Sequence, residues 1–491
     1  MMSKHLARAR AYEETAERSV PPEERPVFHL SPRIGWLNDP NGFSRSRGEY
    51  HLFYQYYPYD TRWGPMHWGH AVSTDLLRWK YLPAAMAPDQ PYDKDGCFSG
   101  SALELPDGKQ LIWYTGVLED QAEQQKGFQT QHAAIGDGID YQKVTGNPGL
   151  TVKDLPEGAD PHEFRDPNIW KEGDGYALVV SNLNRVHGTQ LLQFRSKDGL
   201  DWTFDRVLIE NQDCIGWMWE CPDYCPLDGR QVLLISAMYM QEETLDFHRG
   251  NNTICMIGET TENGSFQRST LQTVDHGTDF YAAQTVLSPD GRRIMIGWMQ
   301  NPAVDTSGCS RKIFGQMSLP RELSVRNGKL IQSPIRELEQ LRSEGTSYRD
   351  VRLDGEDQSL PKIRGRVLDL EIFLKPEESC QTFRCRFARA GEQFTELSWQ
   401  PKTGILKIDR SKAETIGTEV MMRQTKVCPE DGNLQIRLIL DRTSAEAFAD
   451  EGRSVMTTTF YTQPKAEEIT FSAEGGARMD ITAYRLCSRD I

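Results

Sequence analysis

The sequence predicts an all-β protein in which a five-bladed β-propeller is followed by a C-terminal β-sandwich. From Val27 onward, short apolar runs are separated by Gly, Asp, Asn and Pro at intervals typical of β-meanders. Two sequence phrases recur five times each at a period a little above 60 residues. After about residue 345, apolar and polar residues alternate strictly instead. A chain of 491 residues is also too long for one ordinary domain.

We expect the N-terminal extension, residues 1–26, to be helical. Residues 3–18 carry no strong turn signal and place Glu14 four residues before Arg18, so they predict an exposed amphipathic helix that ends before Pro21-Pro22. The segment is charged throughout and lacks the apolar core of a secretion signal. On this basis we expect a cytoplasmic protein.

We expect the propeller over residues 27–335, where the two phrases recur. The first phrase is an acidic turn followed by an aromatic residue, with weaker copies in fourth and fifth place: Asp75–Trp79, Asp137–Tyr141, Asp198–Trp202, Asn263–Phe266 and Asn327–Leu330. The second phrase is a β-rich run, found at Tyr50–Gln55, Gln110–Tyr114, Tyr176–Val180, Val232–Ser236 and Ile294–Trp298. Repeats of this length, each with several short strands, are typical of propeller blades, which close radially and protect their sheet edges.

The pattern changes after the fifth copy. Pro334–Arg342 has the composition of a short helical segment, so we place a linker at 336–344. Strands such as Leu368–Ile372 and Leu434–Leu438 then have one apolar and one polar face. This alternation predicts a two-sheet sandwich over 345–491.

Composition narrows the kind of ligand. The formal net charge of −15 argues against a nucleic-acid partner, and no apolar run is long enough to cross a bilayer. The ten cysteines are scattered, so we expect reduced thiols. Cys221 and Cys225 have no second pair that would complete a metal site. The many aromatic residues suit a turn-rich β protein that stacks neutral sugars on its rings.

A third repeated position precedes each β-rich run and collects polar residues: Asp39, Ser99, Asp166, Glu220 and Tyr281. Equivalent positions on the innermost strands of a propeller face the central axis, so three carboxylates are expected to meet there. Converging carboxylates repel one another, so one holds a proton while another stays ionised. An acid and a nucleophile side by side are what retaining glycoside hydrolysis requires.

Six motifs carry a resemblance to a known family. They are Trp36-Leu-Asn-Asp-Pro-Asn-Gly42, Phe98-Ser-Gly100, Phe164-Arg-Asp-Pro167, Trp219-Glu-Cys-Pro222, Asp279-Phe-Tyr-Ala282 and Leu319-Pro-Arg-Glu-Leu323. In this order they resemble glycoside hydrolase family 32, the invertases, fructanases and sucrose-6-phosphate hydrolases. The resemblance implies a five-bladed propeller with a C-terminal sandwich, and no cofactor or metal. It makes Asp39 the nucleophile, Glu220 the acid/base and Asp166, beside Arg165, the stabiliser of the transition state.

The resemblance also implies residues that bind the substrate. These are Trp36, Asn38, Gln55, Trp63, Phe98, Ser99, Arg165, Tyr281 and Trp298. For the tryptophans, packing between blades is the alternative, and Gln55 and Ser99 would equally serve as polar groups at strand ends. Cys221 either tunes the acid beside it or is an inert buried thiol. For His67 and His70 we expect structural or subsite roles rather than a metal.

We therefore predict a retaining, exo-acting β-fructofuranosidase for sucrose, sucrose 6-phosphate or short fructo-oligosaccharides, with no nucleic-acid or membrane partner. Inulin or levan hydrolysis and transfructosylation remain alternatives, and a non-catalytic sugar-binding propeller is a remote one. The loops Leu118–Thr130 and Met240–Asn251 would set the width of the pocket rim. Arg62, Arg311 and Lys312 are the candidate cations for a phosphorylated substrate. The oligomeric state stays open between a monomer and a homo-oligomer.

Overall fold

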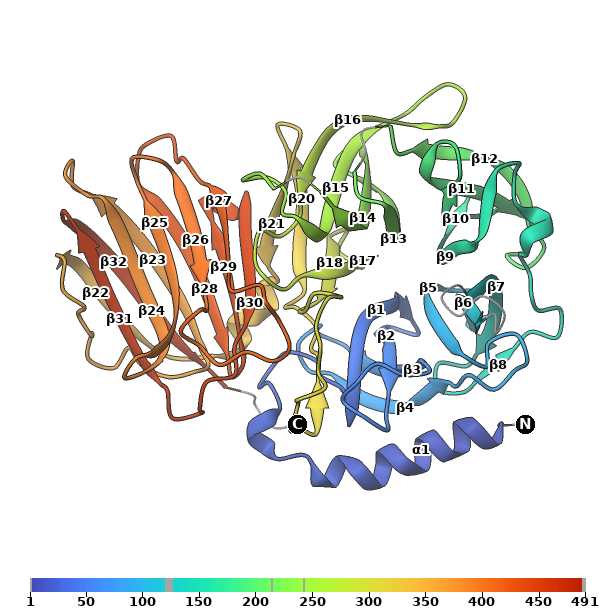
Figure 1. Cartoon of the computed structure of the whole chain (residues 1–491), viewed down its shortest axis with the longest axis horizontal. Helices are drawn as coiled ribbons and strands as arrows, with labels where there is room; N and C mark the ends of the chain where they lie inside the picture. The colour runs from blue at the N-terminus through green and yellow to red at the C-terminus, as the bar shows by residue number, and fades with distance from the viewer. Residues whose placement is uncertain (1, 120–126, 213–214, 242, 488–491) are drawn as a thin grey trace.

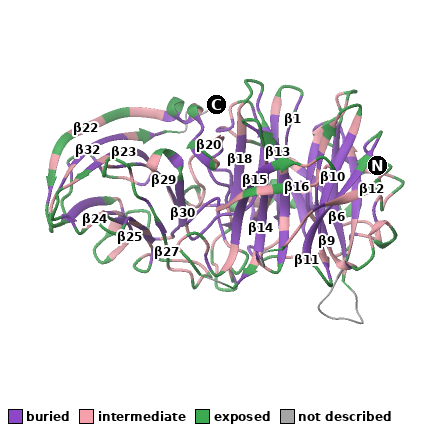
Figure 2. Cartoon of the chain, turned by 90° about the horizontal axis from the view of Figure 1, so that it is seen from above, coloured by how far each residue is buried: buried purple, intermediate pink, exposed green. Residues whose placement is uncertain are grey.

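The computed structural model describes residues 2–119, 127–212, 215–241 and 243–487. A ring of five small sheets lies beside a two-sheet sandwich (Figure 1). Figure 2 shows that buried residues gather along the strands and exposed ones in the turns. The predicted fold class, a five-bladed propeller followed by a sandwich, is confirmed.

Each blade contains four antiparallel strands in order from the axis outward. The first two blades are β1 (Gly35–Ser46), β2 (Glu49–Tyr57), β3 (His67–Ser73), β4 (Lys80–Met86), and β5 (Gly96–Glu104), β6 (Gln110–Glu119), β7 (Gly127–Gly136), β8 (Tyr141–Lys143). The third and fourth are β9 (Ala159–Glu172), β10 (Gly175–Asn184), β11 (Gly188–Ser196), β12 (Thr203–Glu210), and β13 (Met218–Leu227), β14 (Arg230–Met240), β15 (Gly250–Thr260), β16 (Phe266–Thr273). The fifth is β17 (Tyr281–Leu287), β18 (Arg293–Trp298), β20 (Arg321–Arg326), β21 (Lys329–Pro334).

The repeated phrases have a physical origin in this architecture. The acidic phrase forms the turn between the third and fourth strand of each blade. The side chain of Asp198, for example, accepts hydrogen bonds from the backbone N–H groups of Leu200 and Asp201, which closes the turn. The β-rich phrase lies on the second strand, which has a neighbour on both sides and is almost fully buried.

The ring closes between the fifth and the first blade. The inner strand β17 packs against β1, and the short strand β19 (Ile313–Phe314) pairs in parallel with β1. A chain segment from the last blade therefore joins the sheet of the first and pairs the inner edge of β1 at Gly35 and Trp36.

Each inner strand has a shift of register where the polar position lies. At three of these shifts a non-glycine residue has a left-handed φ: Asp166 (63°), Cys221 (48°) and Ala282 (56°). Such bulges turn a side chain out of the regular alternation of a strand, and they commonly lie next to active sites. Here they direct side chains toward the axis.

The sandwich has a six-stranded and a five-stranded sheet. The larger is ordered β22 (Arg342–Leu353), β32 (Ala477–Leu486), β23 (Leu368–Pro376), β28 (Leu434–Asp441), β29 (Ser444–Ala449), β30 (Ser454–Thr459). The smaller is ordered β27 (Met422–Lys426), β26 (Ile405–Asp409), β25 (Gln393–Gln400), β24 (Thr382–Ala390), β31 (Glu468–Glu474). The strict alternation puts the apolar residues of both sheets into one core between them. The short helix η4 (Arg336–Leu341) separates the sandwich from β21; the other short helices are η1 (Glu17–Ser19), η2 (Pro22–Glu24), η3 (Val152–Asp154) and η5 (Asp450–Gly452).

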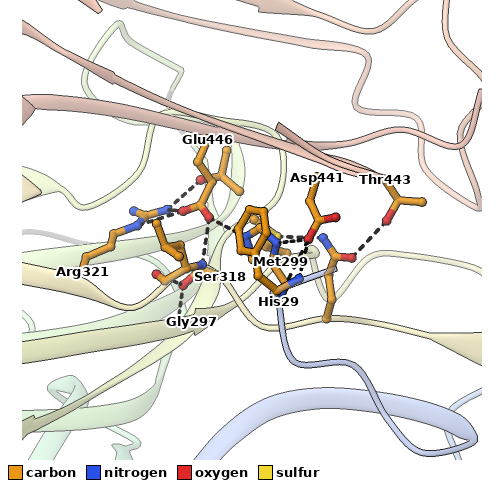
Figure 3. A network of polar contacts seen from close by, with 12 residues as sticks. His29, Gly297, Met299, Ser318, Arg321, Asp441, Thr443 and Glu446 are labelled. Carbon is orange, nitrogen blue, oxygen red and sulfur yellow. Dashed lines mark hydrogen bonds and ion pairs between the residues drawn. The ribbon is translucent and has the colours of Figure 1, made fainter. Parts of the chain in front are cut away.

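The propeller and the sandwich share a continuous interface. Phe448 and Val455 of the sandwich belong to the same apolar cluster as Leu319 and Ile335 of the propeller side. A polar network lies beside this cluster (Figure 3). In it, Arg321 pairs with Glu446 at 2.6 Å, and both side chains are fully buried.

The N-terminal helix α1 (Lys4–Ala16) lies along the first blade, beside β4 (Figure 1). The expectation of an exposed helix is wrong for one of its faces, because Leu6, Ala9 and Glu13 are buried. The Glu13 carboxylate accepts a hydrogen bond from the backbone N–H of Ala84 at 2.9 Å and pairs with Arg33 at 3.3 Å. Among the described residues, no helix has the length and apolar character to span a membrane.

Candidate active site

The five polar positions come from the five inner strands, and hydrogen bonds join two pairs of them between adjacent blades. Ser99 Oγ of the second blade donates to Asp39 Oδ2 of the first at 2.7 Å. The Tyr281 hydroxyl of the fifth blade donates to Glu220 Oε2 of the fourth at 2.9 Å. The structure thus brings together residues separated by as many as 242 positions.

Asp39 sits among donors that favour its ionised form. Besides Ser99, Asn38 Nδ2 donates to Asp39 Oδ1 at 3.1 Å, and Trp36 Nε1 fixes Asn38 by donating to its Oδ1 at 2.7 Å. Burial raises the pKa of Asp39, and the hydrogen bonds from Ser99 and Asn38 oppose that rise. The side chain is still partly exposed, as a group that must reach a substrate atom requires.

Glu220 has both carboxylate oxygens held. Arg165 Nε donates to Oε1 at 3.1 Å, opposite the bond from Tyr281. Burial raises the pKa of Glu220, and the charge of Asp39 raises it further, whereas Arg165 and Tyr281 lower it. About a fifth of the side chain, 21%, remains exposed. A carboxyl group with a raised pKa and partial exposure suits proton transfer.

Asp166 is the most buried of the three carboxylates. Its Oδ2 accepts a hydrogen bond from the backbone N–H of Cys221 at 2.9 Å, and its own N–H donates to Thr115 Oγ1 at 2.9 Å. Burial and then the charge of Glu220 raise the pKa of Asp166, while Arg165 lowers it. These two backbone contacts fix the position of Asp166.

Cys221 lies between two of these carboxylates. Its Sγ is 3.5 Å from Asp39 Oδ2 and 3.7 Å from Asp166 Oδ2. Burial, followed by the charges of Asp166 and Asp39, raises the thiol pKa well above its usual value. The thiol is therefore neutral and lies as a weak donor beside both carboxyl groups.

The remaining predicted residues divide into two groups. Trp63 (52% exposed) and Phe98 meet edge to face at 5.8 Å, which gives the first and second blades an aromatic edge that a sugar can contact. Trp36 and Trp298 are buried and pack against each other at 5.8 Å, which agrees with the alternative of packing between blades. Gln55 is also buried and donates to the Cys97 carbonyl at 3.0 Å, which agrees with the alternative of a satisfied strand residue.

The histidines have structural partners. His67 contacts the Pro65 carbonyl at 2.9 Å, and His70 contacts His51 at 3.0 Å. Among the residues that the structure describes, no three His, Cys, Asp or Glu side chains are arranged to hold a metal ion. Residues 120–126 and 242, within the two loops expected to form the rim, lie outside the described residues.

The sequence did not predict the groups that position the side chains of Arg165 and Tyr281. Glu163 forms an ion pair with the Arg165 guanidinium. The same guanidinium also donates a hydrogen bond to Gln129 Oε1 at 3.4 Å. The backbone of Ser236 accepts a second contact from the Tyr281 hydroxyl at 3.2 Å. Glu163 lies two residues before Arg165 and so could have been proposed from sequence, whereas Gln129 and Ser236 belong to other blades and carry no local signal.

The site therefore contains three carboxyl groups in different environments. Asp39 is held by side-chain donors, Glu220 has a raised pKa, and Asp166 is fixed by a backbone N–H group. Two carboxyl groups of unlike environment are the requirement for acid-assisted cleavage of a glycosidic bond. The geometry requires no metal for that chemistry.

Comparison with known proteins agrees with this chemistry. Residues 29–334 match the glycosyl hydrolases family 32 N-terminal domain, and residues 337–485 match the family's C-terminal domain. A sucrose-6-phosphate hydrolase of Escherichia coli is 33% identical over 462 residues, which cover 92% of each chain. The Bacillus subtilis sucrose-6-phosphate hydrolase is 30% identical and covers 98% of each chain.

Solved structures show the same fold. A mutant GH32 beta-fructofuranosidase of Bombyx mori in complex with sucrose is 31% identical, with a TM-score of 0.84 and coverage of 98% of both chains. The sucrose-6-phosphate hydrolase of Lactobacillus gasseri has the same TM-score at 25% identity and covers 99% of this chain and 97% of its own. With both family domains matched in order along nearly the whole sequence, the chain belongs to glycosyl hydrolase family 32 and is a glycoside hydrolase of the invertase type.

Proposed function

We propose that the protein hydrolyses the terminal β-fructosyl bond of sucrose or sucrose 6-phosphate with retention of configuration. Relatives whose names specify sucrose-6-phosphate hydrolase and raffinose invertase support this substrate class, as does the neighbouring structure that holds sucrose. The single observation that carries the proposal is the approach of Asp39 and Glu220 to each other: both carboxyl groups are partly exposed, they have different donors, and the charge of Asp39 acts on Glu220.

In the first half of the reaction, an Asp39 oxygen attacks the anomeric carbon of fructose and Glu220 gives its proton to the leaving glucosyl oxygen. The glycosidic bond breaks, and a fructosyl ester on Asp39 remains. Ser99 and Asn38 hold the Asp39 carboxylate in place for this attack. Asp166 accepts hydrogen bonds from fructose hydroxyls as positive charge develops on the ring.

In the second half, the ionised Glu220 removes a proton from water, and the water oxygen attacks the anomeric carbon. The ester breaks, Asp39 leaves as a carboxylate and Glu220 is again protonated. Arg165 and Tyr281 stabilise the ionised Glu220 between the two steps. A sugar hydroxyl in place of water would give transfer instead, so both outcomes use the same residues.

The state of Arg62, one of the candidate cations, favours the neutral sugar over a phosphorylated one. Arg62 pairs with its neighbour Asp60 at 2.9 Å, and Arg311 contacts the Glu24 carbonyl at 2.6 Å. Arg62 thus already has an acidic partner, whereas the carbonyl oxygen positions Arg311 without compensating its charge. The cytoplasmic location stays a prediction from the charged N-terminal residues, and the choice between monomer and homo-oligomer stays open.

Specific activity on sucrose, sucrose 6-phosphate, kestose, inulin and levan, measured side by side with product analysis, tests the proposal. We expect the highest kcat/KM on sucrose, with fructose and glucose as the products. Release of fructose from inulin or levan at a comparable or higher kcat/KM would replace the proposal by fructan hydrolysis. Products longer than the substrate would indicate transfer.

A further inference from the structure

A second cavity lies where the N-terminal segment, the loop ahead of β19 and the sandwich meet. It encloses about 550 Å³, a size typical of sites for small molecules. Five of its lining residues are arginines: Arg311, Arg364, Arg366, Arg442 and Arg485. In a chain of net charge −15, this concentration of positive charge is unexpected.

Most of these arginines have no acidic partner among the described residues. Arg364 pairs with Glu467 at 3.2 Å, and both side chains are exposed. Within the part of the chain that the structure describes, no carboxylate forms an ion pair with the other four. Arg311 instead donates to a backbone carbonyl of Glu24, and Arg442 donates to that of Arg25 at 2.7 Å. Carbonyl oxygens position a guanidinium but leave its charge uncompensated.

Arg366 is the innermost of the five and only 8% exposed. One of its terminal nitrogens donates to Thr462 Oγ1 at 3.1 Å and to the Gln463 and Ala466 carbonyls at 3.3 Å. Its guanidinium lies 4.9 Å from the centre of the Phe460 ring. Among the residues that the structure describes, none accepts a hydrogen bond from the Nε–H group of Arg366.

A buried cation of this kind is costly unless an anion accompanies it. Burial lowers the pKa of Arg366 to about 10, although the charges of Asp441 and Glu467 act against this. Neither carboxylate is placed to remove the cost, because Asp441 accepts hydrogen bonds from His29 and from Val27 N–H, and Glu467 pairs with Arg364 at the surface.

We propose that this cavity binds a small metabolite bearing a phosphoryl group, separately from the active site. The planar guanidinium fork matches phosphate oxygens in geometry and charge. Val367, Leu368 and Leu486 supply an apolar wall for the rest of the molecule. Because the lining residues come from the N-terminal segment, the propeller and the sandwich, the bound anion stabilises the contact among all three parts.

The test is a ligand titration of the full-length protein in which the thermal unfolding midpoint is measured at each concentration. The probes are inorganic phosphate and glucose 6-phosphate, with sodium chloride at matched ionic strength as the control. We expect a saturable rise of the midpoint with both phosphates and no saturable rise with chloride. Tighter binding of glucose 6-phosphate would identify the metabolite as the ligand, and equal binding would identify the phosphoryl group alone.

Variants locate the site. We expect Arg366→Gln to abolish the saturable rise and Arg485→Gln, which leaves the buried network intact, to weaken the apparent Kd at least about tenfold. Arg478→Gln is the matched control, because Arg478 lies on the same strand β32 outside the cavity. Activity on sucrose checks that each variant folds. A chloride-like response, or the same Kd in Arg485→Gln and Arg478→Gln, would overturn the proposal.

Discussion

Arg165 Nε donates to Glu220 Oε1 at 3.1 Å and joins the third blade to the fourth at the centre of the propeller. The residue after Arg165 is Asp166, and its carboxylate is in turn bound by the N–H of Cys221, the residue after Glu220. Two adjacent residues on one strand thus contact two adjacent residues on another. Because the contacts are reciprocal, the positions of the two carboxylates depend on the same pair of bulges.

Replacement of Tyr281 by Phe removes one donor from Glu220. The bond from Tyr281 lowers the pKa of Glu220, so its loss raises that pKa. The acid must be protonated in the first step, and kcat/KM therefore falls as the pH rises through this pKa. We expect the alkaline limb of the profile of kcat/KM against pH to move up by about one unit. An alkaline limb that stays in place would show that Glu220 is not the group that titrates there.

Replacement of Ser99 by Ala acts on the opposite limb. The hydrogen bond from Ser99 lowers the pKa of Asp39, so its loss raises that pKa. Because the nucleophile must be ionised, the pH range of activity becomes narrower on its acid side. We expect the acid limb to move up by about one pH unit while the alkaline limb stays in place. The Tyr281→Phe profile is the matched control, and a shift of the same limb in both variants would refute the separate roles.

The strands and the three carboxylates were predictable because their signals are local. Asp198 closes a turn with its own neighbours, so each blade repeats its signal in the sequence. Asp39, Asp166 and Glu220 lie beside bulges at equivalent places on inner strands. These equivalent places produce the regular spacing of the three residues along the sequence. A side chain such as Gln129, which reaches Arg165 from another blade, leaves no comparable trace.

Contacts between distant segments were not predictable for the same reason. The sequence pattern predicts Glu13 as a solvated helix residue, yet its carboxylate accepts a hydrogen bond from the backbone N–H of Ala84, 71 positions away. His29 Nδ1 lies 2.8 Å from Asp441 of the sandwich (Figure 3), a separation of 412 positions. Nothing in the flanking residues distinguishes either group from an ordinary polar residue.

The His29 contacts predict how stability depends on pH. Burial alone lowers the pKa of His29, but hydrogen bonds with Asp441 and Glu446 outweigh it and raise the pKa to about 9. The protonated form is thus favoured in the folded state. Its contribution, on the order of 3 kcal/mol, is complete below pH 6.5 and is lost as the pH rises through about 9.

Denaturant unfolding from pH 6 to 10 measures this effect. We expect the free energy of unfolding of the wild type to fall over the upper part of this range, and the fall to be absent in His29→Gln. A variant with the same slope as the wild type would assign the pH dependence to other groups.

We propose that the chain divides into the extension 1–26, the propeller 27–335, the linker 336–344 and the sandwich 345–491. A fragment of residues 1–340 would lose Glu446, the buried partner of Arg321, and would expose the apolar surface around Leu319. Removing one partner of a buried ion pair is strongly destabilising. We expect the fragment to aggregate on expression, as size-exclusion chromatography would show. A monomeric, stable fragment would contradict the packing role of the sandwich.

The central claim is that Asp39 attacks the sugar. Mass spectrometry of the Glu220→Gln variant tests it directly. In place of sucrose, the variant is given an activated aryl fructoside, and the reaction is quenched with acid during turnover. The protein is then digested and its peptides are weighed. The activated substrate forms the ester without an acid, and the missing base slows its hydrolysis. We predict that the peptide containing Asp39 carries one additional hexosyl unit. An unmodified Asp39 peptide, or a hexosyl unit on Asp166, would contradict the claim.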